Sequence, residues 1–304
     1  MRIAVLGGGA MGALYGGYLS RKNDVTIVDV YEALVDKINK DGLVIAEPDG
    51  SSAVYHPKAA VSTKGMAPAD LVIVFVKAMF SRAALQNNSD LIGKDTYIMT
   101  LQNGSGHEQV LSQFTDLDHV VIGTTQHNSA VTGLGEIRHG GSGMTHVGCV
   151  QGDVNRLAGI AQTLTESGLE ADCCENVMQL IWNKMFTNVS ASALTGVLQV
   201  PLGYIVKNEN AWAICEKLIR EAVAVAKGEG LTFDVDEKIA EVRAVCENSP
   251  EGITSICADI SKGRKTEVDT ISGSVVAASR RNGVPAPTHE TIVNLVHAIE
   301  GKNA

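Results

Sequence analysis

Apolar and small residues alternate along the first thirty positions in an order that predicts a strand, a helix and a second strand. Ile3–Leu6 is a continuous apolar run, short enough and rich enough in β-branched residues for a buried parallel strand. A helical run of small residues reaches Ser20, and Asp24–Asp29 forms the second strand. This order is typical of a parallel sheet covered by helices.

The alternation of strands and helices continues to about residue 171. A polar helix is expected at Tyr31–Lys40 and a β-rich stretch at Leu43–Ser62. The remaining elements expected in this part are strands at Leu71–Val76, Tyr97–Leu101 and His119–Ile122, hairpin strands between Gly135 and Val147, and a helix at Val154–Ser167.

From Glu175 onward helical periodicity replaces the apolar runs. Long helices are predicted at Val177–Val197, Asn208–Glu229, Val235–Glu247, Ser255–Gly263 and Thr266–Asn282. We therefore predict an α/β protein with an N-terminal Rossmann-type dinucleotide-binding domain, residues 1–171, and a C-terminal all-α domain, residues 172–304. A chain of 304 residues is long enough for two such domains.

A glycine-rich turn joins the first strand to the first helix. Gly7, Gly9 and Gly12 form G-x-G-x-x-G, whose glycines allow a tight turn, close approach of a pyrophosphate and close packing of helix on strand. The free N–H groups and positive dipole end of the helix favour an anion. We expect a dinucleotide to bind along the whole turn, at Gly7, Gly8, Gly9, Ala10, Met11 and Gly12.

Asp29 ends the second strand and narrows the choice of cofactor. A carboxylate at this position can accept hydrogen bonds from both ribose hydroxyls of NAD and repels the 2′-phosphate of NADP. The nearest basic residue that follows is Lys37, so the sequence favours NAD(H). The alternative is that Asp29 caps the following helix.

Two further polar residues follow predicted strands. Lys77 ends the run Leu71–Val76, and Asn103 follows Tyr97–Leu101. Ligands of open α/β sheets bind beyond the carboxyl ends of the strands, so both side chains can contact a cofactor, and Asn103 can also hold a substrate oxygen. Alternatively, Lys77 is an ordinary exposed lysine and Asn103-Gly104 a simple turn.

The helix at Val177–Val197 carries the main catalytic candidate. Lys184, Asn188 and Ser192 are spaced at i, i+4 and i+8 and so share one helix face among apolar neighbours. Partial desolvation would lower the pKa of Lys184 and make it a better proton donor near neutral pH. The alternative is a lysine that snorkels to solvent from an amphipathic helix.

The segment from 255 to 269 holds residues with two interpretations each. Ser255 can begin a helix, and Thr266 can cap the last long helix with Glu267 and Asp269 in its first turn. These structural roles are sufficient to explain the residues, which alone prove no site.

Composition excludes several classes of function. The net charge of −9 and the pI of about 5.4 argue against nucleic-acid binding. No apolar run is long enough to cross a membrane, and no cleavable signal pattern is visible. The six cysteines and the histidines show no metal-binding spacing, and free thiols are typical of the reducing cytosol. We expect a cytoplasmic protein without a metal.

The order and spacing of these pieces resemble the ketopantoate reductase (2-dehydropantoate 2-reductase) family over nearly the whole chain. The matching pieces are Gly7–Gly12, Lys77-Ala78, Gln102-Asn103-Gly104, Gly123-Thr124-Thr125, Lys184 with Asn188, and Ser255 with Glu267-Val268-Asp269. The resemblance implies a Rossmann domain, a helical domain and an active site in the cleft between them. It also implies Lys184 as general acid, Asn103, Asn188 and Ser255 as ligands of substrate or cofactor oxygens, and Glu267 as a residue that orients groups near the nicotinamide.

Three positions depart from the family pattern. Ser192 stands where a second Asn is usual, and Leu202 stands where an Asn commonly follows the proline. Asp29 and Val30 replace the usual NADPH-binding Arg. NADP(H) is therefore implied by the resemblance, whereas Asp29 favours NAD(H). The changes at the substrate end favour an oxo acid that lacks the hydroxyl of ketopantoate, and Ser192 stays among the expected substrate-binding residues.

The resulting hypothesis is NAD(P)H-dependent reduction of a 2-oxo acid, with ketopantoate to (R)-pantoate as first choice. The runner-up is an NAD-dependent D-2-hydroxyacid dehydrogenase of the same family that acts on branched or aromatic 2-oxo acids. A hypothesis of another class is a non-catalytic NAD(H) sensor. The expected partner is a small-molecule substrate, without nucleic acid or membrane, and helical domains often pair, so a homodimer is compatible with the sequence.

Overall fold

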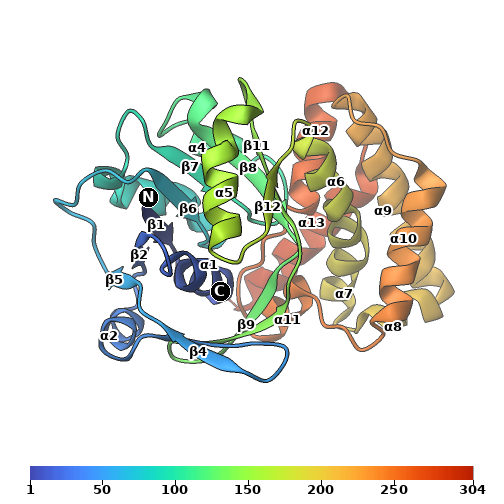
Figure 1. Cartoon of the computed structure of the whole chain (residues 1–304). Coiled ribbons are helices and arrows are strands. Elements are labelled where there is room, and N and C mark those ends of the chain that lie inside the picture. Colours follow the sequence, from blue (N-terminus) through green and yellow to red (C-terminus); the bar gives the residue numbers. More distant parts are fainter. Residues whose placement is uncertain (304) are drawn as a thin grey trace. The chain divides into compact units, whose positions relative to one another are not determined.

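The computed structural model describes residues 1–303, which divide into two compact units. The first unit contains residues 1–102 and 107–177, and the second contains residues 103–106 and the chain from Met178 onward. Figure 1 shows the first unit as strands and helices in blue to green and the second as helices in yellow to red. The predicted class, α/β with a Rossmann-type first domain and an all-helical second one, is confirmed.

The first unit is built on an eight-stranded sheet. In spatial order the strands are β12 (Ala171–Cys173), β11 (Thr145–Cys149), β8 (Val120–Thr125), β7 (Tyr97–Thr100), β6 (Leu71–Val74), β1 (Arg2–Leu6), β2 (Asp24–Val28) and β5 (Lys58–Ala60). All neighbours are parallel except β8 and β11. Strand β1 lies between β2 and β6, so the strand order reverses there, and ligands of such sheets bind at this switch point.

Four strands form a second, smaller sheet in the same unit. Their order is β4 (Ser52–Tyr55), β3 (Leu43–Ala46), β10 (Glu136–Gly141) and β9 (Asn128–Gly133). The hairpin expected between Gly135 and Val147 is wrong. Strand β10 pairs with β9, which precedes that range, and the strand at residues 145–149 pairs with β8 in the large sheet.

Helices cover the first unit between these strands. They are α1 (Ala10–Leu19), α2 (Glu32–Asp41), α3 (Ser81–Asn87), α4 (Glu108–Leu111) and α5 (Ala158–Glu166), with short 3₁₀ turns at Ala78–Phe80, Ser89–Leu91, Leu117–His119 and Val154–Leu157. Helix α1 is buried along most of its length, from Gly12 to Leu19. Its small residues allow this close packing, as the sequence predicts.

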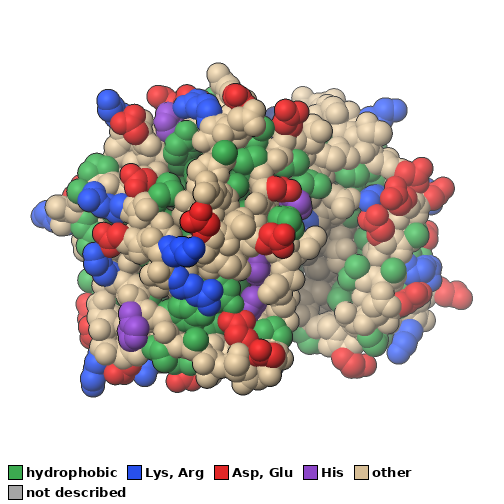
Figure 2. All heavy atoms as spheres, in the orientation of Figure 1, with side chains coloured by type: hydrophobic (Ala, Val, Ile, Leu, Met, Phe, Trp, Pro, Cys, Tyr) green, Lys and Arg blue, Asp and Glu red, His purple; other side chains and the backbone are tan. Residues whose placement is uncertain are grey.

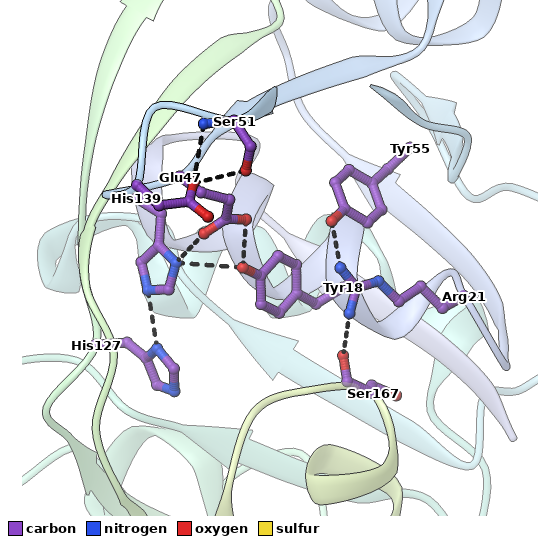
Figure 3. A network of polar contacts seen from close by, with 9 residues as sticks. Tyr18, Arg21, Glu47, Ser51, Tyr55, His127, His139 and Ser167 are labelled. Carbon is purple, nitrogen blue, oxygen red and sulfur yellow. Dashed lines mark hydrogen bonds and ion pairs between the residues drawn. The ribbon is translucent and has the colours of Figure 1, made fainter. Parts of the chain in front are cut away.

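A buried polar network connects α1 to the smaller sheet (Figure 3). The Tyr18 hydroxyl donates to Glu47 Oε1 at 2.5 Å, and Glu47 Oε2 lies 2.9 Å from His139 Nδ1. His139 Nε2 lies 3.1 Å from Nδ1 of His127. Burial and the neighbouring His139 lower the pKa of His127, so this imidazole is neutral near pH 7. The network pairs most of these buried polar atoms, although among the described residues His127 Nε2 has no hydrogen-bond partner.

The second unit is helical. Its elements are α6 (Val177–Thr187, which begins at the last residue of the first unit), a π turn η5 (Asn188–Ser192), α7 (Ala193–Leu198), α8 (Leu202–Lys207), α9 (Glu209–Gly228), α10 (Val235–Asn248), α11 (Ser255–Ser261), α12 (Ser272–Asn282), α13 (Pro287–Glu300) and a 3₁₀ turn (Gly301–Asn303). The predicted helices are present, and α8 and α13 are additional.

The predicted cap at Thr266 is wrong. Helix α12 begins only at Ser272, so Thr266 and Glu267 lie in the irregular segment before it. The backbone N–H and the hydroxyl of Thr266 both donate to Glu300 Oε1, at 2.8 and 2.7 Å. The Thr266 hydroxyl also accepts the N–H of Val268 at 3.2 Å, so Thr266 closes a local turn and is tied by Glu300 to α13.

Acidic and basic side chains are interspersed over the face shown in Figure 2. Within residues 1–303, no helix combines the length and the apolar character needed to cross a bilayer.

Candidate active site

The glycine turn between β1 and α1 has the geometry that the motif predicts. Gly7 has a φ of +101°, and a Cβ there would lie 2.8 Å from the backbone nitrogen of Val76. A Cβ on Gly12 would lie 1.8 Å from the Gly7 carbonyl oxygen, so only glycine permits this contact between helix and turn. Gly9 faces open space, and no side chain caps the first turn of α1. The turn therefore fits a pyrophosphate at the helix N-terminus.

Asp29 holds the other side of this turn. Its Oδ2 accepts the N–H of Gly8 at 2.7 Å, and its Oδ1 accepts the N–H of Tyr31 at 2.9 Å. Helix α2 starts at Glu32 after its N-cap residue Tyr31, so Asp29 shapes the turn ahead of the helix and is not its cap. Each carboxylate oxygen has a second lone pair, which leaves acceptors for ribose hydroxyls.

A pocket of about 390 Å³ lies beside the Asp29 carboxylate at the carboxyl ends of β1, β2 and β6. Most of its walls are apolar, and the residues that line it are Leu6, Gly7, Val28, Asp29, Val30, Val61, Ser62, Val76, Phe80, Ala83, Ala84, Asn87 and Asn88. Among these described residues no lysine or arginine occurs. The pocket suits a flat, neutral ring such as adenine beside a ribose, and sequence reasoning missed it because its walls come from four separate segments.

The ends of β6 and β7 are tied together by Gln102, whose role the sequence did not reveal. Its side-chain amide donates to the carbonyl of Val76 at 2.5 Å and to the hydroxyl of Ser81 at 3.0 Å. Lys77, half-buried, comes directly after this fixed carbonyl and before the 3₁₀ turn at Ala78–Phe80. The backbone of Lys77 is thus held in place at the carboxyl end of β6, where ligands of such sheets bind.

Asn103 belongs to the second unit, in the short segment Asn103–Gly106, although the chain before and after this segment belongs to the first unit. The segment Asn103–Gly106 is held there by the N–H of Ser105, which donates to the carbonyl of Thr270 at 3.0 Å. Thr270 lies three residues after Glu267 in the same segment before α12. Asn103 and Glu267 therefore lie on two segments that this backbone bond joins.

Lys184, Asn188 and Ser192 lie along one continuous helical rod, but not in a regular α-helix. Lys184 is in the last turn of α6, and residues 188–192 form the π turn η5. Ser192 Oγ lies 3.5 Å from Asn188 Oδ1, so these two side chains are neighbours. The hydroxyl of Ser272 reaches the Val189 carbonyl inside the turn at 3.4 Å. Single π turns are frequent at functional sites.

The environment of Lys184 favours proton donation. Part of its side chain is exposed, yet the surrounding protein desolvates the ammonium group and lowers its pKa below the usual value for lysine. The sequence-based expectation of a lowered pKa thus has a physical cause in the structure.

The two remaining candidates lie close to α11 and α12. Ser255 is exposed and is the first residue of α11, whose N-cap is Thr254. Glu267 is half-buried, and its backbone carbonyl accepts the N–H groups of Thr270 and Ile271 at 3.2 and 3.1 Å. The described residues contain no group of three or more His, Cys, Asp or Glu side chains arranged to hold a metal ion.

Comparison with known proteins gives a consistent result over the whole chain. The family profile described as "Ketopantoate reductase PanE/ApbA" matches residues 3–152, and the profile of its C-terminal domain matches residues 176–300. A 2-dehydropantoate 2-reductase of Halobacterium salinarum is 32% identical over 97% of this chain and 98% of its own length. The chain belongs to the ketopantoate reductase family. It is accordingly an NAD(P)-dependent oxidoreductase of the kind that acts on a CH–OH group.

Solved structures of the family agree with the fold. D-mandelate dehydrogenase with NADH and anilino(oxo)acetate has a TM-score of 0.91 and 30% identity, covering 100% of this chain and 99% of that chain. A PanE/ApbA family ketopantoate reductase from Ralstonia eutropha JMP134 has a TM-score of 0.89 and 26% identity, covering 100% and 99%. A ketopantoate reductase and D-mandelate dehydrogenase thus share this architecture.

Proposed function

We propose that the protein is an NADH-dependent D-2-hydroxyacid dehydrogenase that reduces aromatic or branched 2-oxo acids. The observation that carries the cofactor choice is Asp29, a carboxylate fixed by the N–H groups of Gly8 and Tyr31 beside a pocket whose lining residues are uncharged apart from Asp29 itself. A 2′-phosphate placed there would meet a negative charge and no cation from that lining.

The chemistry needs one hydride and one proton. NADH, when bound, supplies the hydride to C2 of the oxo acid and leaves as NAD⁺. Lys184 would donate its proton to the C2 oxygen, so that the developing alkoxide becomes the hydroxyl group of the product. Before that transfer its positive charge would also stabilise the developing negative charge.

The other candidate residues would bind and orient. Asn188, Ser192 and Ser255 offer donors for the carboxylate and the C2 oxygen, which hold C2 in place. The remaining assignments are Asn103 and Glu267 near the nicotinamide ribose, Lys77 on a polar group of the cofactor, and the turn Gly7–Gly12 on the pyrophosphate.

Two features favour an aromatic or branched substrate over ketopantoate. Ser192 and Leu202 replace polar Asn side chains that the family usually has, and Leu202 is buried. D-mandelate dehydrogenase, a protein whose substrate carries an aromatic ring, is similar to this chain at 30% identity. Ketopantoate remains the second candidate, because curated relatives at 32% and 30% identity are 2-dehydropantoate 2-reductases.

The first experiment measures oxidation of NADH and of NADPH with phenylglyoxylate, 2-oxoisovalerate and ketopantoate. We expect the highest kcat/KM with NADH and phenylglyoxylate or 2-oxoisovalerate. Preference for ketopantoate would assign the protein to pantoate formation instead. Tight NADH binding without turnover of any 2-oxo acid would contradict both and would support a cofactor sensor.

A further inference from the structure

A chain of hydroxyl groups connects the end of the π turn to the start of α11. The Thr195 hydroxyl donates to the Ser192 carbonyl at 2.9 Å, and it lies 2.8 Å from the hydroxyl of Thr254. Thr254 Oγ1 accepts the N–H of Cys257 at 3.3 Å as the N-cap of α11. Thr254 Oγ1 also lies 3.4 Å from the same Ser192 carbonyl, so its proton can be donated to Thr195 Oγ1 or to that carbonyl.

The same two elements are in close apolar contact beside this chain. A Cβ on Gly196 would lie 2.4 Å from Cγ2 of Ile256 and 3.5 Å from Cδ1 of Ile260. Helices α7 and α11 therefore approach at a glycine, and the buried hydroxyl of Thr195 lies next to that contact. Thr195 is fully buried and Thr254 is half-buried, so the protein itself sets most of the geometry of this hydroxyl pair.

The chain of hydroxyl groups ends at the backbone of two residues that are proposed to bind the substrate. Ser192 provides the accepting carbonyl, and Ser255 directly follows Thr254. The side chain of Ser192 in turn lies 3.5 Å from that of Asn188. The hydroxyl chain thus fixes the distance between the π turn and Ser255, which lie more than sixty residues apart in the sequence.

We propose that Thr195 and Thr254 are positioning residues for the oxo-acid site. They hold Asn188 and Ser192 at a set distance from Ser255 so that all three can bind one small substrate. This inference rests on the proposed function, because it takes these three residues as substrate ligands. Neither threonine needs to reach the reacting atoms. Substitution of either one should therefore weaken substrate binding more than it slows the chemical step.

The test uses substitutions that remove or keep the hydroxyl. Thr195→Val removes the shorter bond to the Ser192 carbonyl and the contact with the Thr254 hydroxyl. It leaves the longer contact of Thr254 with the Ser192 carbonyl, at 3.4 Å, and the cap of α11, whereas Thr195→Ser keeps the hydroxyl. Thr96→Val is the matched control, because Thr96 is a buried threonine of the first unit whose hydroxyl donates to the Ala69 carbonyl at 2.6 Å. For each variant, KM for phenylglyoxylate, kcat, the Kd of NADH and the thermal midpoint are measured.

We expect Thr195→Val to raise the KM for the oxo acid about tenfold, as loss of one net hydrogen bond would. The kcat and the Kd of NADH should change much less, and Thr195→Ser should restore KM to within about twofold of the original value. Thr96→Val should lower the thermal midpoint without raising KM.

A double-mutant cycle with Thr254→Val adds a second measurement. The effects of Thr195→Val and Thr254→Val on KM should be strongly non-additive, because both remove the same hydroxyl pair. Equal KM values for Thr195→Val and Thr96→Val, or full additivity, would overturn the positioning role. Absence of turnover in the unsubstituted protein, by contrast, would overturn the proposed function itself.

Discussion

A lysine ammonium in water is a weak general acid at neutral pH, because its pKa lies near 10.4. Desolvation at Lys184 lowers that pKa, so the proton is easier to transfer to an alkoxide. Lys184→Ala should lower kcat by about two to four orders of magnitude, which is the usual contribution of general acid catalysis. The Kd of NADH should be nearly unchanged, since the glycine turn and Asp29 belong to the first unit.

The matched control is Lys217→Ala, which removes an exposed lysine of α9 in the same unit. Its kcat should equal that of the unsubstituted protein. The pH dependence of kcat tests whether the protonated form of Lys184 is the active one. Because the acid form is the active one, kcat should fall as pH rises through the lowered pKa, and Lys184→Ala should lose this limb. Near-normal turnover of Lys184→Ala would exclude it as the acid.

Asp29 is the second residue whose chemistry can be isolated. Asp29→Asn keeps an oxygen that can accept a backbone N–H but removes the charge, so the turn can persist. NADH should bind about tenfold more weakly and the preference over NADPH should narrow, because a bond to a charged acceptor is replaced by one to a neutral acceptor. Fluorescence titration with both cofactors measures this. An unchanged ratio of the two Kd values would mean that Asp29 only shapes the turn.

At the scale of elements, local patterns were predictable and distant pairings were not. The run Leu71–Val76 and the glycine motif specify β6 and the first turn through a few adjacent residues. The pairing of β3 with β10 joins segments about ninety residues apart, which no local pattern encodes. The hydrogen bonds of Thr266 to Glu300, 34 residues later, likewise join segments that no local pattern relates.

The candidate site divides along the same line. The turn Gly7–Gly12 and Asp29 were recognised as parts of one sequence motif, but the bond from the Gly8 N–H to Asp29 was not predicted. Lys184 was found because a lysine is unusual in an apolar helix. The π turn at residues 188–192 was not predicted, because one wide turn hardly alters the spacing of the side chains.

Helix α13 contains a histidine whose burial predicts a pH effect on stability. His289 is fully buried, its Nε2 lies 2.9 Å from the Leu218 carbonyl, and burial lowers its pKa from 6.5 to about 4. The nearby Glu221 carboxylate accepts the His289 backbone N–H and opposes this shift only in part. Between about pH 6.5 and 4, His289 is therefore protonated in the unfolded chain and neutral in the folded chain.

Stability should be fully present above pH 6.5 and decline as pH falls toward 4, by about 3 kcal/mol from this group alone. His289→Gln keeps a donor for Leu218 but cannot take up a proton. Urea unfolding at pH 7, 5.5 and 4.5 should show a smaller decline for this variant, whereas His56→Gln, at an exposed position, should follow the unsubstituted protein. Parallel declines in all three proteins would contradict the assignment to His289.

At the scale of the whole molecule, the path of the chain couples the two units. The segment Asn103–Gly106 leaves the first unit, packs in the second through the bond from Ser105 to Thr270, and returns. Unfolding of the first unit would pull on this segment and remove its contacts. We therefore expect the two units to unfold together, and this is testable because both tryptophans of the chain, Trp182 and Trp212, lie in the second unit.

NAD⁺ is expected to bind the first unit. It can therefore stabilise that unit while tryptophan fluorescence reports the unfolding of the second unit. At a concentration about 100 times its Kd, a ligand that binds only the folded state adds about 2.7 kcal/mol of stability. If unfolding is cooperative, tryptophan fluorescence excited at long wavelength should report this whole gain, and the urea midpoints from fluorescence and far-ultraviolet circular dichroism should coincide. A fluorescence midpoint that does not move while the dichroism midpoint rises would show that the helical unit unfolds on its own, and that residues 103–106 do not transmit the stabilisation.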